Sequence, residues 1–98
     1  MKATAESKVW TVEVLFQETD DATDAEAILE IGAHRYAGWG RARRNPADPK
    51  VPQIGEELAA ARALSDLAHK VLDAAASSIE DLGLEPIGVM LGSSGRAR

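Results

Sequence analysis

The chain has 98 residues, of which 45% are hydrophobic and 28% are charged, and this composition suits one folded domain rather than two cores or a disordered segment. It contains no cysteine, which excludes disulfides and cysteine-based zinc sites. The absence of a secretory leader pattern and of an apolar run of about eighteen residues predicts a cytoplasmic protein without a membrane span.

The net charge of −5 is spread unevenly along the chain. Residues 1–31 carry a net charge of −6, residues 32–50 carry +4, and residues 51–98 carry −3. An acidic total argues against a general nucleic-acid coat, because binding to phosphates depends mainly on positive charge. The basic middle segment still allows a focused contact.

Residues 8–18 are expected to form the first strand, because apolar residues alternate with polar ones and so share one face. The apolar residues are Trp10, Val12, Val14 and Phe16. Residues 19–24 are strongly acidic and predict an exposed turn or loop. Residues 25–31 alternate again and predict a second strand, followed by a short connection that favours an antiparallel hairpin.

Residues 35–43 predict a third strand whose two faces differ. One face consists mainly of small residues, namely Tyr36, Gly38, Gly40 and Ala42. The other face is basic and aromatic and consists of Arg35, Trp39, Arg41 and Arg43. Small residues allow a helix backbone to approach closely, so we expect a helix to pack on the first face.

Three prolines between positions 45 and 52 predict the linker from sheet to helix. A long helix is expected over residues 53–76, with Glu56 and Glu57 in its first turn, where the helix dipole favours acids. Apolar residues recur at helical spacing and predict its buried face. They are Ile54, Leu58, Ala61, Leu64, Ala68, Val71, Leu72 and Ala75.

A short second helix is expected to begin at Ser77, and residues 86–91 are compatible with a final extended piece. These elements predict an α+β fold, in which a three-stranded antiparallel β-meander packs against a long C-terminal helix and a short second helix. The single domain is expected over residues 8–91, with a flexible N-terminus over residues 1–7 and a flexible tail over residues 92–98.

One long helix covers only one face of such a sheet, so the opposite face is expected to be open to solvent. Three apolar side chains on neighbouring strands lie on that face: Leu15, Ile28 and Trp39. They form a candidate dimer or docking patch, and we expect a homodimer. Association through the helices is the alternative, because isolated exposed apolar residues are normal.

The candidates for contact with RNA or another partner are Arg35, Trp39, Arg41, Arg43 and Arg44. Arginine binds phosphate bidentately, and an exposed aromatic ring can stack on an unpaired base. The alternative is that these arginines pair across strands with Glu13, Glu26 and Glu30, which share their face. We favour the cross-strand pairs.

The sequence shows no constellation for catalysis or for holding a metal or cofactor. Ser65, Asp66 and His69 have helical spacing that brings side chains together, but a nucleophilic triad also needs an oxyanion hole and a cleft. Two histidines without cysteine argue against a zinc site. We therefore expect a protein that is not an enzyme and has no cofactor and no small-molecule substrate.

Three segments resemble a known family. GWGRARRNPAD at residues 38–48, and VPQIGEEL and ARALSDL at residues 51–58 and 61–67, are similar to a small actinobacterial family. That family is catalogued as a domain of unknown function and includes mycobacterial proteins of the dormancy regulon. The resemblance covers about residues 9–80.

The resemblance implies a β-β-β-α-α fold akin to the double-stranded-RNA-binding class, a homodimer, and a shape like that of ribosome hibernation factors. It implies no catalytic residues. The leading hypothesis is a non-enzymatic, dimeric, stress- or dormancy-associated protein that contacts ribosomal RNA or a protein partner. The alternative is a protein–protein interaction regulator that binds no nucleic acid and whose arginines are structural.

Overall fold

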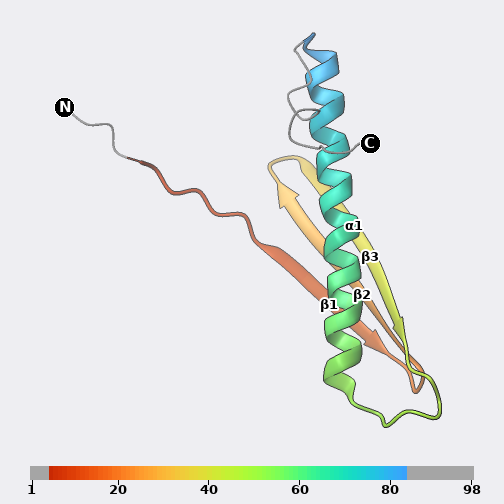
Figure 1. Cartoon of the computed structure of the whole chain (residues 1–98). Coiled ribbons are helices and arrows are strands. Elements are labelled where there is room, and N and C mark those ends of the chain that lie inside the picture. The colour runs from red at the N-terminus through yellow and green to blue at the C-terminus, as the bar shows by residue number, and fades with distance from the viewer. Residues whose placement is uncertain (1–4, 84–98) are drawn as a thin grey trace.

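The computed structural model describes residues 5–83 and shows three strands followed by one long helix. In chain order the elements are β1 (Val12–Glu18), β2 (Ala22–Ile31), β3 (His34–Arg43) and α1 (Pro52–Asp81). The strands form one antiparallel sheet in the order β1-β2-β3, and α1 lies across one face of it (Figure 1). The α+β meander expected from the sequence is therefore confirmed.

β2 begins earlier than the sequence pattern predicts. The acidic segment before it shrinks to a tight turn, in which the N–H of Thr19 donates to the carbonyl of Ala22 over 2.9 Å. Asp24 pairs with Arg41 on the neighbouring strand, and Thr23 is buried on the helix side of the sheet. The loop prediction is therefore wrong for residues 22–24, which belong to β2. Asp24 is tolerated in the strand because it pairs with Arg41, and the local sequence around Asp24 does not show this pairing.

α1 approaches β3 so closely that the two backbones meet at glycines. A Cβ atom placed on Gly38 would lie 2.3 Å from the carbonyl oxygen of Ala63 and 2.3 Å from the backbone nitrogen of Leu67. A Cβ atom on Gly40 would lie 2.4 Å from the carbonyl oxygen of Ala59. No side chain fits at such distances, so the expectation that small residues on the third strand admit a helix is confirmed.

This close packing determines which helix residues are buried. The buried residues of α1 are Ala59, Ala63 and Leu67, and Val71 packs against them from the edge of the core. Most of the larger residues expected on the buried face are exposed instead, namely Ile54, Leu58, Leu64 and Leu72. The close contact with Gly38 and Gly40 turns Ala59, Ala63 and Leu67 toward the sheet instead of the predicted positions, so that part of the prediction is wrong.

α1 is one continuous helix of 30 residues, so the expected short second helix is wrong. Ser77 and Ser78 stay within it, because a serine costs a helix interior only about 0.5 kcal/mol relative to alanine, less than starting a new helix would cost. The chain leaves the helix through Gly83, whose φ is 72°. The extended piece considered for residues 86–91 and the tail at residues 92–98 lie outside the described residues.

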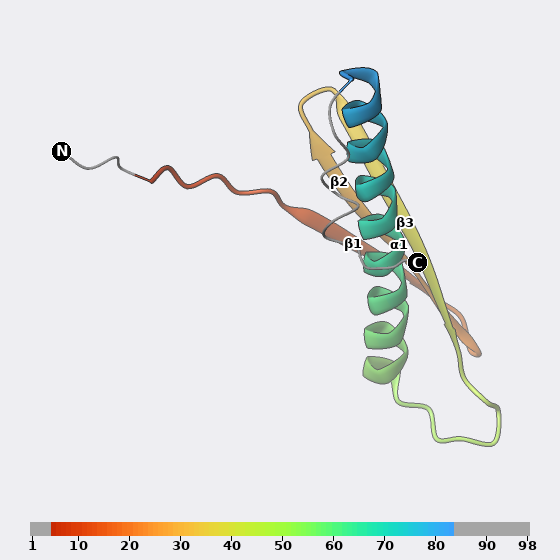
Figure 2. The ribbon, with the colours of Figure 1, turned by 45° about the horizontal axis from the view of Figure 1, so that its top comes forward.

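α1 packs on β3 and β2 and leaves most of β1 uncovered, with only Val14 of that strand packed against the core. Val12 and Phe16 point to the helix side of the sheet, yet both are exposed. Residues 5–11, which we call the arm, precede β1 without joining the sheet and lead away from it (Figure 2). The prediction that the strand begins at residue 8 is wrong, and Trp10 in the arm is 55% exposed.

Replacing Gly38 by valine is expected to lower the free energy of unfolding by on the order of 1–3 kcal/mol or more, because the added side chain would overlap backbone atoms of α1. The measurement is the urea midpoint and slope of the full chain. Ala37→Val, on the opposite face of the same strand, is the control and should change stability by no more than about 0.5 kcal/mol. Equal midpoints for the two variants would contradict the packing described above.

Candidate interaction surface

Three apolar side chains gather on the face of the sheet opposite α1. Cross-strand register places Leu15 on β1 and Trp39 on β3 directly beside Glu26 on β2, and Ile28 lies two residues further along β2. Neighbours at this spacing on one face are within reach of one another. We call Leu15, Ile28 and Trp39 the outer patch. Leu15 and Trp39 are 52% and 58% exposed, so the expected position of this patch is confirmed.

Two arginines of this face pair with acids on the adjoining strand. Arg41 donates from Nε and Nη2 to the two carboxylate oxygens of Asp24, over 2.5 Å and 2.9 Å. Hydrogen bonding to this guanidinium lowers the pKa of Asp24 below its ordinary value of 3.8. Arg35 lies 3.8 Å from Glu26 and 3.7 Å from Glu30. The favoured cross-strand pairing is thus present, with Asp24 in place of the expected Glu13.

Arg43 differs from Arg35 and Arg41, because it has no acidic partner on the adjoining strand. It lies opposite Ala22 in the register, and within residues 5–83 its side chain makes no hydrogen bond or ion pair. It is exposed. Of the arginines proposed as contact residues, Arg43 is therefore the one whose charge is most available to a partner.

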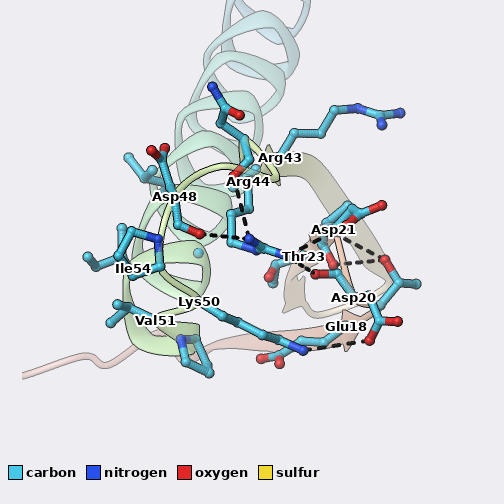
Figure 3. A pocket seen from close by; sticks show the side chains of 18 residues that line it. Glu18, Asp20, Asp21, Thr23, Arg43, Arg44, Asp48, Lys50, Val51 and Ile54 are labelled. Carbon is cyan, nitrogen blue, oxygen red and sulfur yellow. Dashed lines mark hydrogen bonds and ion pairs between the residues drawn. The ribbon is translucent and has the colours of Figure 1, made fainter.

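Arg44 points into a hollow at the end of the sheet (Figure 3). This hollow has a volume of about 400 Å³ and lies between the β1–β2 turn, the β3–α1 loop and the start of α1. The guanidinium donates to the carbonyl of Asp48 over 2.8 Å and to that of Asp20 over 3.4 Å, and it lies 3.8 Å from Asp21. Arg44 therefore joins two loops, which argues against its expected role as a contact residue.

The outer edge of β3 is covered by side chains one helical turn apart on α1. Arg62 donates to the carbonyl of Arg41 over 2.7 Å, and Lys70 donates to the carbonyl of Ala37 over 2.8 Å. Between them, Asp66 accepts a hydrogen bond from the backbone N–H of Trp39 over 2.9 Å. We call Arg62, Asp66 and Lys70 the edge cap. Sequence analysis missed it, although polar residues at spacings of four on one helix flank were a signal for it.

The hydrogen bonds of the edge cap also show how Ser65, Asp66 and His69, which have triad-like spacing, are arranged. Asp66 is engaged by β3 and by Lys70 at 3.1 Å, while Nδ1 of His69 donates to the carbonyl of Ser65 over 2.8 Å. These side chains do not form a nucleophile–base–acid chain. In the part of the chain that the structure describes, no group of three or more histidine or acidic side chains is placed to hold a metal ion.

Two acidic side chains, Glu18 at the end of β1 and Glu56 near the start of α1, lie in contact. Pro52 opens the helix, so Glu56 and Glu57 occupy its second turn and the expectation of first-turn acids is wrong. A hydrogen bond with Glu18, desolvation and the charge of Glu18 together raise the pKa of Glu56 above its ordinary value of 4.5. Glu18 and Glu56 are therefore two carboxyl groups in contact beside the start of α1.

A model of the Rv2632c-like family matches residues 8–87, which include the whole sheet and α1. The chain belongs to the Rv2632c-like family. This result confirms the small family of unknown function that the sequence resembles, in so far as its relatives are mycobacterial.

Two relatives and one solved structure define how far the likeness extends. The uncharacterized protein Rv2632c of Mycobacterium tuberculosis is 44% identical over 80 residues, which cover 82% of this chain and 86% of the relative. The uncharacterized protein Mb1767 of Mycobacterium bovis is 43% identical over 77 residues, which cover 79% and 82%. The crystal structure of Rv2632c matches with a TM-score of 0.76 at 42% identity, covering 86% of this chain and 100% of that one. The names of these Rv2632c-like proteins state no activity, so function is argued from the surface.

Within the described residues, no helix combines the length and the apolar character that crossing a membrane requires. α1 is long enough, but charged residues recur along it, including the edge cap.

Asp66→Asn is expected to lower the urea midpoint at pH 7, because the hydrogen bond from Trp39 and the neighbouring Lys70 hold the pKa of Asp66 below its ordinary value of 3.8. A lowered pKa contributes stability that is complete above about pH 3.8 and is lost as the pH falls further. The difference between wild type and variant should therefore shrink in acid.

The control is Asp73→Asn, which removes an exposed acid of the same helix that has no hydrogen bond or ion pair among residues 5–83. Urea midpoints are compared at pH 7 and at several values down to pH 3. If Asp66→Asn tracks Asp73→Asn across this range, the carboxylate does not stabilise the edge of β3.

Proposed function

We propose that this protein is a non-enzymatic binding protein that works as a homodimer and docks a protein partner on the outer face of its sheet. The observation that carries the proposal is the outer patch, three apolar side chains on three strands with Glu26 between them. A compact apolar centre with a charged surround is the usual make-up of a protein-binding surface.

The composition of the patch supports this reading. Tryptophan is the residue type most enriched among those that dominate binding energy, and Trp39 is 58% exposed in the centre of a strand. Its backbone is held rigid on both sides, by β2 and by the edge cap. A side chain on such a rigid support loses little conformational entropy when a partner covers it.

The charges around the patch favour a protein over a nucleic acid. Arg35 and Arg41 already pair with carboxylates, and Arg44 is engaged by backbone carbonyls. An RNA phosphate would have to displace these acids, and the chain carries a net charge of −5. Displacing the acids and approaching an acidic protein would both cost an RNA binding free energy, so a partner that uses the apolar patch is favoured.

The homodimer, the cytoplasmic setting and the stress- or dormancy-associated role belong to the same proposal. A ribosome contact, which the family resemblance implies, is compatible with it because a ribosome offers protein surfaces as well as RNA. The partner is therefore sought first among proteins.

A photoreactive benzoylphenylalanine at position 39 is expected to crosslink to protein in intact cells, because that side chain stands in the centre of the patch. The matched control places the same residue at Leu72 on α1, which is 57% exposed. The crosslink at position 39 should disappear when Leu15→Lys puts a charge into the patch. Equal products at positions 39 and 72, or a product that survives Leu15→Lys, would contradict the proposal.

Binding to RNA is the second candidate, and the exposed Arg43 without an ion pair is the observation that favours it. We expect the wild-type protein to show no salt-dependent binding to single-stranded or structured RNA at about 50 mM salt, because most arginines of this face are paired. Affinity that falls with salt, with a slope reduced by about one in Arg43→Gln, would instead support this candidate. Fluorescence anisotropy with labelled RNA makes the measurement.

A further inference from the structure

The two edges of the sheet are treated differently. The outer edge of β3 is closed by the edge cap, whose three side chains take up two carbonyls and one N–H of that strand. Within residues 5–83, the outer edge of β1 makes no backbone hydrogen bond. An open edge of this kind is a template for pairing with another strand.

The helix side of β1 is also uncovered. Val12 and Phe16 lie on that side and are 37% and 40% exposed, although they are apolar. α1 adds an apolar side chain above them: successive helix residues point about 100° apart, so Leu64 lies on the flank opposite Arg62, which reaches the β3 edge. Leu64 is exposed there.

The arm has the alternating apolar residues that could cover the exposed side of β1. Its sequence continues the alternation of β1, so in a paired strand Trp10 would share the side of Val12 and Val9 the side of Leu15. Val9 is the most exposed apolar side chain described, at 81%. The arm leads beyond the end of its own sheet, so it cannot cover β1 of its own chain (Figure 2).

We propose that two copies of the chain pair β1 with β1, antiparallel about a two-fold axis, so that the arm of each copy extends β1 pairing along the open edge of the other. The two three-stranded sheets then form one continuous sheet. This interface gives the homodimer of the proposed function its contact surface and leaves the outer patch of each copy open to a partner.

The alternation of side chains between the two faces of a strand favours a second copy of the chain as the partner of the open β1 edge. Directly opposite residues in an antiparallel pair point to the same face. With the axis at Val12, Trp10 lies opposite Val14 of the second copy, Val9 lies opposite Leu15, and Lys8 lies opposite Phe16. The apolar residues Val9 and Trp10 then meet apolar partners, and the like-charge pair of this register, Glu6 with Glu18, lies at the ends of the paired segment.

The neighbouring register, with the axis at Glu13, would place that carboxylate opposite its own copy, which is unfavourable. The axis at Val12 places Glu13 opposite Thr11 instead. The axis at Glu13 would also pair Lys8 with Glu18, so the two registers differ in whether the like-charge pair lies at the centre of the interface or at its ends. In both registers a second copy of this chain places an apolar residue opposite Trp10, either Val14 or Phe16.

The test uses single cysteines in the full chain, which has none of its own. Val12→Cys should form a disulfide-linked dimer rapidly under mild oxidation, because opposite residues at a two-fold axis have Cα atoms about 4.5–5.5 Å apart. Leu72→Cys, a matched exposed position on α1, and Trp39→Cys in the outer patch should form it slowly. Rapid linkage at position 39 or 72 but not at position 12 overturns the proposal.

Light scattering on a sizing column provides the second measurement. Trp10→Ser should weaken the dimer at least about tenfold, because a buried tryptophan commonly dominates an interface. The monomer should keep its urea midpoint, since Trp10 lies outside its sheet and is largely exposed.

The two proposals fail in different ways. A wild-type chain that is monomeric at tens of micromolar (roughly the range in which modest dimers form) overturns this inference and the homodimer of the proposed function. A dimer that survives Trp10→Ser and forms no rapid disulfide at position 12, in a protein whose photocrosslink at position 39 still captures a different protein, overturns this inference alone.

Discussion

Two glycines of β3 let the backbone of α1 lie directly against the sheet, and the position of the helix follows from that contact. Gly38 and Gly40 admit the carbonyls of Ala63 and Ala59, so the helix is drawn over β3 and β2. A helix placed over β3 brings Arg62, Asp66 and Lys70 to the outer edge of that strand, where they satisfy its backbone groups. The same placement leaves Val12 and Phe16 of β1 exposed, because one helix spans only part of a three-stranded sheet.

The small core has consequences for the rest of the molecule. Its buried residues are mostly alanines, so burial of large side chains contributes less than in a typical domain of this size. Three of the four aromatic residues, Trp10, Phe16 and Trp39, are exposed, while Tyr36 packs against the core. Aromatic surface that a single chain does not bury is surface that association can bury, which is why a dimer along β1 and a partner on the outer patch both fit this fold.

The outer face combines a fixed charge pattern with an apolar centre. Asp24 and Glu26 pair with arginines that would otherwise form a basic strip, and the residues of the outer patch lie around Glu26. The paired arginines of this segment therefore stabilise the sheet rather than offer free charge to a partner. This is the physical reason to rank a protein contact above an RNA contact, even though residues 32–50 carry a net charge of +4.

The amino-acid sequence by itself determined the strand order, the faces of the strands and the family, because alternation and turn residues act over short distances and are visible in one chain. It placed Leu15, Ile28 and Trp39 on one face and the small residues of β3 on the other. Only the tertiary structure decided which face of α1 is buried, because the glycine contact turns Ala59, Ala63 and Leu67 to the sheet rather than the residues that helical periodicity favours. It also decided the role of Arg44 and Asp66, whose partners lie 24 and 27 residues away in the chain and are brought together by folding alone.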